Sequence, residues 1–250
     1  MIARPVRALV SLVAVLLAVA CTNSFEIPIE TPIRPKLDVA AFQRVLVAGF
    51  IAGGTEDVDG NLETTRLLRS QLRTKSQLRV IDSDVLPLVD VASEGRDSGG
   101  AATAPPPIKE EKDLEPYEHL FANVEYWKRI GEEYQQPLIV TGTVMFTPLQ
   151  RNSIVQREQE VYDSFGRRRV VPVRTYQERK GFSLDGRFIF IDGRSGATLH
   201  SESFGEQILY NANQTTPALS SYFELMDRLI PTFLSTLSSQ KIKGTRILLQ

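Results

Sequence analysis

The sequence is poor in the residues that build metal sites and catalytic dyads. Its 250 residues include 1 cysteine and 2 histidines, His119 and His200. A single cysteine cannot form an internal disulfide, and a structural zinc site needs more ligands of these two types. Neither histidine has a serine or cysteine at a spacing that suggests a nucleophilic triad. We therefore expect no metal, no cofactor and no catalytic residue, and we predict that the chain is not an enzyme.

An excess of charge of one sign is also missing. Lys+Arg number 29 and Asp+Glu number 30, which gives a net charge of -1 and a pI near 6.2. Proteins that bind nucleic acid usually carry a basic excess that attracts phosphates. We therefore expect no nucleic acid among the partners of this chain.

Long apolar runs are confined to the amino terminus. Arg4 and Arg7 precede a stretch from Ala8 to Ala20 that is apolar apart from Ser11. This stretch is too short to span a bilayer comfortably and has the length of the apolar region of a secretory signal. Residues 1–20 are therefore predicted to be a signal peptide.

The only cysteine follows this predicted signal directly. The string Leu17-Ala18-Val19-Ala20-Cys21 resembles a lipobox, with Ala18 where a lipobox usually has leucine. Because A-x-A also precedes ordinary cleavage sites, a plain secreted protein is the alternative. We predict cleavage before Cys21 and lipidation of its sulfur, which would hold the chain to a membrane. Cys21 is followed by Thr22 instead of aspartate, and this resembles the enteric lipoproteins that are sorted to the outer membrane. The resemblance implies a bacterial cell-envelope protein that is anchored in the outer membrane and faces the periplasm.

The residues after the cysteine divide into a tether and a domain. Residues 21–40 are predicted to be a lipidated, Pro-rich tether, because Pro28, Pro32 and Pro35 favour extended backbone. Residues 41–250 have the length and composition of one globular domain. We predict a single mixed α/β domain over that range.

The first half of this domain predicts a β-α-β start. Residues 44–50 form a valine-rich apolar run typical of a buried strand. A helix is predicted over 62–75, capped by Asp59 or Asn61, and a second strand over 78–82. This order favours a parallel pair joined by a right-handed crossover.

The middle of the chain alternates between polar and apolar segments. Residues 92–113 contain little to bury and are predicted to be a flexible loop. A helix over 116–134 and a strand over 138–146 follow. Residues 153–180 are predicted to form a polar hairpin that turns at Ser164-Phe165-Gly166.

The last third predicts an antiparallel meander followed by a long helix. Apolar residues alternate along a strand at Phe182, Leu184, Phe188 and Phe190. A turn over 192–196 and a strand over 197–209 come next. A helix that begins at Thr216 carries a broad apolar face that includes Tyr222 and Phe233. The predicted fold class is α/β (α+β): a central mixed sheet with a β-α-β start, an antiparallel meander and a long C-terminal helix, in two or three layers.

The strings RVLVAGF, LETTRLLRSQL, LRVID, LIVTGTVMF and RFIFIDGRSGATLHSESFGE resemble a family of envelope domains. It includes the curli secretion channel lipoprotein, the flagellar outer-membrane lipoproteins and the amino-terminal domain of the Tol-system propeller protein. A lipoprotein activator of penicillin-binding proteins shares the general fold. The resemblance implies a non-catalytic binding or assembly component of the cell envelope, in secretion or surface-organelle assembly. It also implies that the partner is an envelope protein, and it leaves open whether the chain forms a homo-oligomer. The alternative function is that of an activator of cell-wall synthesis that acts by binding another protein.

The predicted hairpin over 153–180 carries the most distinctive charge cluster of the chain. Its turn is followed by Arg167, Arg168 and Arg169. Arginine at such a tip could bind anionic lipid, polysaccharide or an acidic partner, and a solvated tip is the alternative. The hairpin has charges on both faces, whereas a lipid-facing strand alternates apolar and polar residues, so we do not expect a pore.

A third hypothesis, from a different class, is a hydrolase or nucleotide-binding enzyme. It requires a pocket in which polar groups converge. Asp57, Asp82 and His119 are the side chains that would have to line it.

Overall fold

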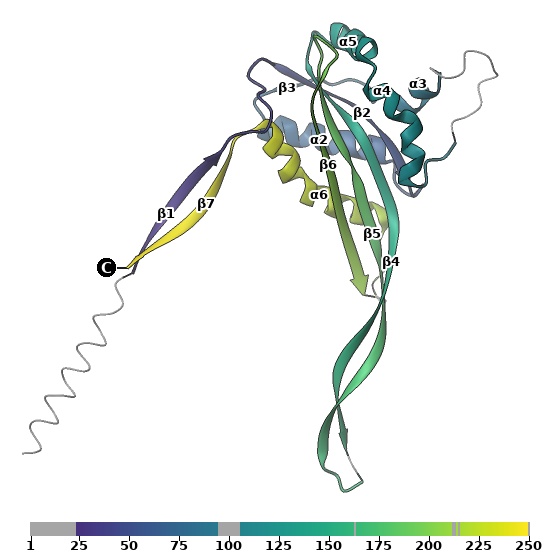
Figure 1. Ribbon diagram of the computed structural model, residues 1–250, viewed down its shortest axis with the longest axis vertical. Helices are drawn as coiled ribbons and strands as arrows, with labels where there is room; N and C mark the ends of the chain where they lie inside the picture. The colour runs from purple at the N-terminus through teal and green to yellow at the C-terminus, as the bar shows by residue number, and fades with distance from the viewer. Residues whose placement is uncertain (1–23, 95–105, 163, 212–213, 215, 250) are drawn as a thin grey trace, which may run out of the picture. The chain divides into compact units, whose positions relative to one another are not determined.

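The computed structural model describes residues 24–94, 106–162, 164–211, 214 and 216–249 (Figure 1). They belong to two compact units. One unit contains strands β1 (Ser24–Ile33) and β7 (Gln240–Leu249), and the other spans Lys36–Ser238. The predicted signal peptide and Cys21 lie outside the described residues.

The smaller unit is a two-stranded antiparallel ribbon. Its pairing is continuous from Ser24 opposite Leu249 to Ile33 opposite Gln240. Each strand of such a ribbon has one unpaired side, where proline is tolerated because no ladder hydrogen bond is lost. The segment predicted to be an extended, Pro-rich tether contains the strand from Ser24 to Ile33, which pairs with β7, a partner that the sequence does not indicate.

The larger unit is built on a five-stranded mixed sheet in the order β3-β2-β4-β5-β6. β2 is parallel to β3 and β4, whereas β4, β5 and β6 pair antiparallel in sequence. The strands are β2 (Arg44–Gly54), β3 (Arg79–Val80), β4 (Leu138–Tyr162), β5 (Arg168–Asp192) and β6 (Thr198–Asn211). The β-α-β start, the antiparallel meander and the predicted fold class are confirmed.

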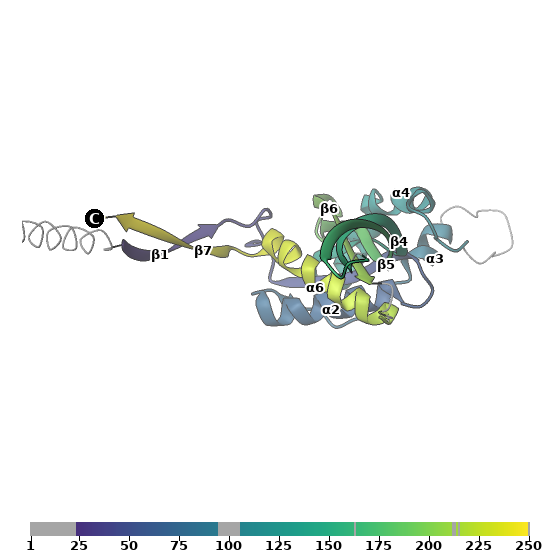
Figure 2. The same cartoon turned by 90° about the horizontal axis from the view of Figure 1, so that it is seen from below.

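One face of this sheet packs against α2 (Gly60–Lys75) and α6 (Ala218–Leu237), which lie side by side in Figure 2. The helix α2 begins at Gly60, two residues before the predicted start. Asp59, one of the two predicted caps, holds this end, because its side chain accepts a hydrogen bond from the Leu62 N–H at 3.0 Å. Phe233 of α6 is fully buried between aromatic rings of β5. The predicted apolar face of the last helix is thus the face that meets the sheet.

The opposite face is covered by short helices, so the unit has three layers (Figure 1). These helices are α3 (Leu88–Glu94), η1 (Glu111–Tyr117), α4 (Glu118–Phe121) and α5 (Val124–Glu133), of which η1 is a 3₁₀-helix. They bury Leu46, Ile139 and Ile189 of the central strands against Leu88 and Trp127.

The continuous helix predicted over 116–134 is wrong, because three short helices occupy that range. Asn123 starts a new helix, since its side chain accepts a hydrogen bond from the Tyr126 N–H at 3.0 Å. Val124, which follows this cap, is 48% exposed. Trp127 is fully buried, and its indole N–H donates to the Leu120 carbonyl at 2.9 Å.

Both ends of the segment 92–113, predicted to be a flexible loop, belong to packed elements. Ala92 is buried in α3, and Glu111 begins η1. Ile108 is also buried against the sheet. Residues 95–105 lie outside the described residues.

A polar cluster fastens β6 to α6. Glu202 accepts hydrogen bonds from Lys36 and, at 2.9 Å, from the Thr236 hydroxyl, and His200 Nε2 lies 3.6 Å from it. Burial raises the pKa of the Glu202 carboxyl, but the hydrogen bonds from Lys36 and Thr236, together with the charge of Lys36 and the nearby His200 ring, outweigh burial and hold that pKa below its ordinary value.

We predict that the Glu202 carboxylate contributes to folding stability in a pH-dependent way. The pKa of Glu202 is lower in the folded protein than in the unfolded chain. Its carboxylate therefore contributes fully to folding stability when the pH is above the pKa of the unfolded chain, and this contribution is lost as the pH falls through the pKa of the folded protein. We expect Glu202→Gln to lower the melting temperature near neutral pH. The difference from the wild type should shrink as the pH falls from about 5 towards 3. Thermal unfolding across this range checks it, and a difference independent of pH contradicts it.

Candidate functional site

Two strands of the sheet continue far beyond their neighbours. Pairing of β5 with β6 ends at Arg179 opposite Asn211, whereas β4 and β5 remain paired up to their turn. We call this two-stranded extension, Asn152–Tyr162 with Arg168–Glu178, the arm. At about 3.3 Å per residue, each of its strands spans about 35 Å. Figure 1 shows the arm extending past the end of the sheet.

The arm and its turn expose large apolar side chains. Ile154 and Tyr176 face each other in register and are 74% and 63% exposed. Phe165 in the turn is 81% exposed. The other exposed apolar residues of the arm are Val161, Tyr162, Val170 and Val171. A two-stranded ribbon is marginally stable by itself, and such a run of exposed apolar residues marks an interaction surface.

The structure places the predicted arginine cluster at the tip of the arm. The Arg167 guanidinium lies 5.4 Å from the centroid of the Phe165 ring. Arg168 pairs with Glu160 at 2.7 Å, and Arg169 stands opposite Val161 in the register. Arginine and apolar side chains thus share this tip. The role of the three arginines in partner contact stays a prediction.

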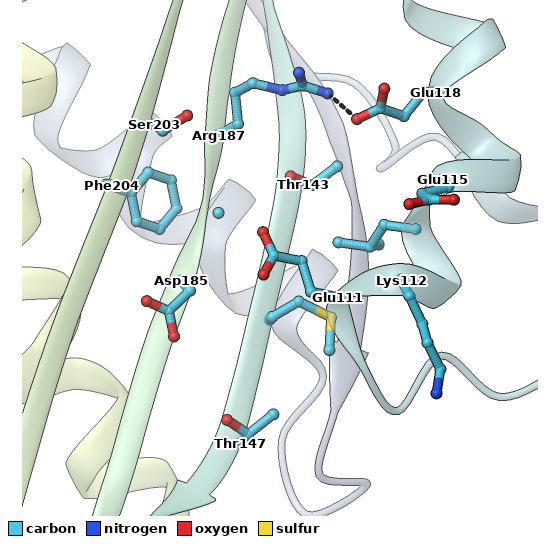
Figure 3. A pocket seen from close by; sticks show the side chains of 13 residues that line it. Glu111, Lys112, Glu115, Glu118, Thr143, Thr147, Asp185, Arg187, Ser203 and Phe204 are labelled. Atoms are coloured by element: carbon cyan, nitrogen blue, oxygen red, sulfur yellow. Dashed lines mark hydrogen bonds and ion pairs between the residues drawn. The ribbon is translucent and has the colours of Figure 1, made fainter.

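A groove of about 790 Å³ lies between the sheet and η1–α4 (Figure 3). Its floor crosses three strands through residues that are opposite in register: Thr143 of β4, Arg187 of β5 and Ser203 of β6. Asp185 stands beside them, opposite Gly205. The groove therefore runs from the helices on one side to the strand β6 on the other.

Carboxylates dominate the groove. Glu111, Glu115, Glu118 and Asp185 line it, together with the cations Lys112 and Arg187. Arg187 pairs with Glu118 at 2.8 Å, the ion pair drawn in Figure 3, and Lys112 pairs with Glu110 at 2.7 Å. Both cations therefore already have an anionic partner. The groove presents negative charge to a ligand.

Local hydrogen bonds set the start of η1 and so place its glutamates. The Asp113 carboxylate accepts from the backbone N–H groups of Glu110 at 2.9 Å and Lys109 at 3.0 Å. These two bonds hold the pKa of Asp113 below its ordinary value. They close the first turn, from which Glu111 and Glu115 extend over the sheet.

The three residues of the enzyme hypothesis are each held by a separate local contact. Asp57 accepts from the Thr55 hydroxyl at 3.0 Å, and Asp82 pairs with Arg73. His119 Nδ1 lies 2.8 Å from the Pro116 carbonyl oxygen. These contacts give no sign of a common pocket. Over the part of the chain that the structure describes, no group of three or more His, Cys, Asp or Glu is placed to hold a metal ion.

The amino-acid sequence does not reveal the groove. Glu111 lies in the segment predicted to be a flexible loop, and Asp185 and Ser203 lie in predicted strands. The available signal was the run Ser201, Ser203 and Gly205, where small residues occupy one face of a strand whose other face carries Phe204 and Ile208. Among the described residues, no helix is long and apolar enough to cross a membrane.

Comparisons with known proteins found similarity in structure only. No protein-family model and no curated protein matches the chain. Among solved structures, the LpoB C-terminal domain from Salmonella enterica is 9% identical, with 69% of this chain and 89% of that chain covered, at a TM-score of 0.35.

Two further structures are similar at the same level. Lipoprotein GNA1162 from Neisseria meningitidis is 13% identical, covering 78% of this chain and 99% of that chain, at a TM-score of 0.34. A PelC dodecamer from Paraburkholderia phytofirmans is 14% identical, covering 85% and 98%, at a TM-score of 0.37. The resemblance to the curli, flagellar and Tol-system group stays a prediction, and the function proposed below rests on the chain's own residues.

Proposed function

We propose that this chain is a lipid-anchored protein of the bacterial cell envelope, at the outer membrane and facing the periplasm. It acts without catalysis, as a binding or assembly component. The process is secretion or the assembly of a surface organelle, and the partner is another envelope protein or a further copy of the chain. The observation that carries the proposal is the arm. Its apolar side chains are exposed because they lie beyond the part of the sheet that the helices cover.

The character of the arm supports contact through side chains. Pro172 lies in β5 within the arm, and a proline on an exposed strand discourages the addition of another strand. Ile154 and Tyr176 form the largest exposed pair on opposite strands. Burying such side chains contributes about 1.5 to 3 kcal/mol each to an interface. An arm with this surface is suited to hold a partner.

The predicted lipid anchor on Cys21, which rests on the sequence, supports the same function. Cys21 is the only cysteine and follows an apolar segment with a positive start. Acyl chains on this residue would keep the domain at a membrane surface. A tethered domain meets partners at the same surface at a raised effective concentration.

The test is the double variant Ile154→Thr and Tyr176→Thr, which keeps strand-forming residues but removes the apolar pair. We expect chemical cross-linking in intact membranes to give one defined adduct with the wild type. The variant should lose most of this adduct, because each lost apolar contact weakens binding by about tenfold or more. Its unfolding free energy should change by about 1 kcal/mol or less, since cross-strand pairs contribute little.

Leu199→Thr provides a matched control. Leu199 is 41% exposed on a strand of the same sheet but lies outside the arm. It should leave the adduct unchanged. An adduct of equal yield in the double variant and the wild type would show that the arm does not bind the partner.

A further inference from the structure

The sheet has one long edge that no described strand covers. β6 is the last strand in the order, with β5 on one side, and it runs from Thr198 to Asn211. Natural edge strands usually discourage further pairing with proline, lysine or short length. β6 has 14 residues and contains no proline, lysine or arginine. Its backbone is therefore available for a strand from another molecule.

Two hydrogen bonds reveal which backbone groups of β6 point outward. The Gln207 carbonyl accepts from Arg228 at 3.4 Å, and the Asn211 N–H donates to the Gln214 side chain at 3.4 Å. Both groups therefore point away from β5. Because alternate residues of an antiparallel strand point to the same side, the N–H and C=O groups of Ser201, Ser203 and Gly205 also point outward.

The same residues open onto the acidic groove. The Ser203 side chain lines its floor, and Ser201, Ser203 and Gly205 are exposed. Asp185 lies against Gly205: its Oδ1 is 2.7 Å from the place where a Cβ on Gly205 would be. The absence of a side chain on Gly205 thus brings this carboxylate close to the edge. Figure 3 shows Asp185 and Ser203 on adjacent strands, with Glu111 and Glu115 on the facing helix.

We propose that the outer edge of β6, at Ser201–Gly205, binds an extended segment of a partner protein with lysine or arginine at alternate positions. The segment adds a strand to the sheet through its backbone. Strands lie about 4.8 Å apart, so alternate side chains of the added strand stand next to Ser203 and Gly205. Their cationic groups reach over these small residues to Asp185 and to the glutamates of η1. This surface is distinct from the arm.

The charge of the groove selects this partner chemistry. Its four carboxylates outnumber its two cations, and Arg187 and Lys112 are already paired with glutamates. An acidic segment would be repelled, and an apolar one would leave the carboxylates without counterions. A basic segment gains both the backbone hydrogen bonds and the charge pairing.

The test measures binding of a synthetic peptide to the purified full-length protein in detergent. The probe is a peptide of about nine residues, a normal strand length, blocked at both ends, with threonine and lysine alternating. One control peptide has glutamate in place of lysine. A second keeps the lysines but carries N-methyl groups on alternate backbone nitrogens, which removes the donors that pairing needs.

Two variants of Ser203 separate backbone pairing from side-chain contact. Ser203→Pro removes the outward N–H, and Ser203→Ala retains it. We expect Ser203→Pro to weaken binding of the lysine peptide by about tenfold or more, equivalent to about 1.4 kcal/mol. Ser203→Ala should bind like the wild type. Asp185→Asn combined with Glu115→Gln should weaken binding and reduce its dependence on salt.

The proposal is supported if the lysine peptide binds saturably while the glutamate and N-methylated peptides do not. It is overturned if the lysine peptide does not bind, if the N-methylated peptide binds equally well, or if the charge variants have no effect. The two control peptides keep the test decisive even if Ser203→Pro fails to fold. Failure of this test leaves the arm-based function untouched, because the arm variants have a separate readout.

Discussion

Cys21→Ala should move the protein from the membrane fraction to the soluble fraction. If the wild type is lipidated on Cys21, its mature amino terminus carries a mass increase equal to several acyl chains. Each buried methylene contributes about 0.8 kcal/mol, so losing these chains removes nearly all membrane affinity. Membrane fractionation with mass spectrometry of the amino-terminal peptide measures both effects. We expect this to be the largest single change available in the chain.

The control and the alternative result are equally informative. Thr22→Ala, next to the cysteine, should leave the acylated peptide and the total membrane-bound amount unchanged. A wild-type amino terminus that begins with an unmodified Cys21 in the soluble fraction would instead identify a plain secreted protein. That result would remove the lipid anchor from the proposed function, and would leave the proposed roles of the arm and of β6 to their own tests.

Phe233→Ala should destabilise the larger unit by about 3 to 5 kcal/mol, the usual cost of truncating a buried phenylalanine. Phe233 is fully buried, and its ring centroid lies 5.0 Å from that of Phe188 and 5.8 Å from that of Phe190. Truncation would leave a cavity where α6 meets β5. Because domains are stable by only about 5 to 15 kcal/mol, this is a large fraction of the total.

Phe165→Ala is the matched control, because it makes the same chemical change at a side chain that is 81% exposed. Its unfolding free energy should differ from the wild type by about 0.5 kcal/mol or less. Urea unfolding followed by tryptophan fluorescence measures both variants, since the single Trp127 is buried in the same unit. Equal shifts for the two variants would contradict the assignment of Phe233 to the core.

Elements with a clear local period were predictable from the sequence. The apolar run over 44–50 covers most of the buried part of β2, which is Val45–Ile51, and the cap at Asp59 is followed directly by the first residue of α2. The alternation through Phe182 and Phe190 marks the buried face of β5, although Phe182 is only partly buried. Such periods can be read locally because burial on one face forces the same residue type to recur.

Pairing between distant segments was not predictable. The strand β7 pairs with β1, although more than 200 positions separate them. The predicted helix over 116–134 has the right apolar spacing, but the cap at Asn123 and the packing of Trp127 divide it. Propensity is a weak guide where tertiary contacts compete with it.

The groove shows the same limit at a functional site. Glu111 and Asp185 are more than 70 positions apart, and only the order β4-β5-β6 with η1 above it brings them to one groove. In the sequence, Gly205 is an ordinary glycine within a strand. Only the structure shows that the Asp185 carboxylate packs against it. The role of a charged or small residue at such a site depends on its neighbours in space, which cannot be identified from the linear sequence.

The amino-acid sequence by itself determined the local elements, the class of fold and the prediction of a signal followed by a lipidated cysteine. Each of these depends on neighbouring residues: a period, a cap, or an apolar run beside a cleavage motif. The sequence also predicted a hairpin over 153–180. The tertiary structure alone decided that this hairpin is an extension of β4 and β5 beyond the end of β6, and that β6 is an uncovered edge beside an acidic groove. Strand order and relative strand length depend on long-range pairing, whose free energy is shared among residues far apart in the chain.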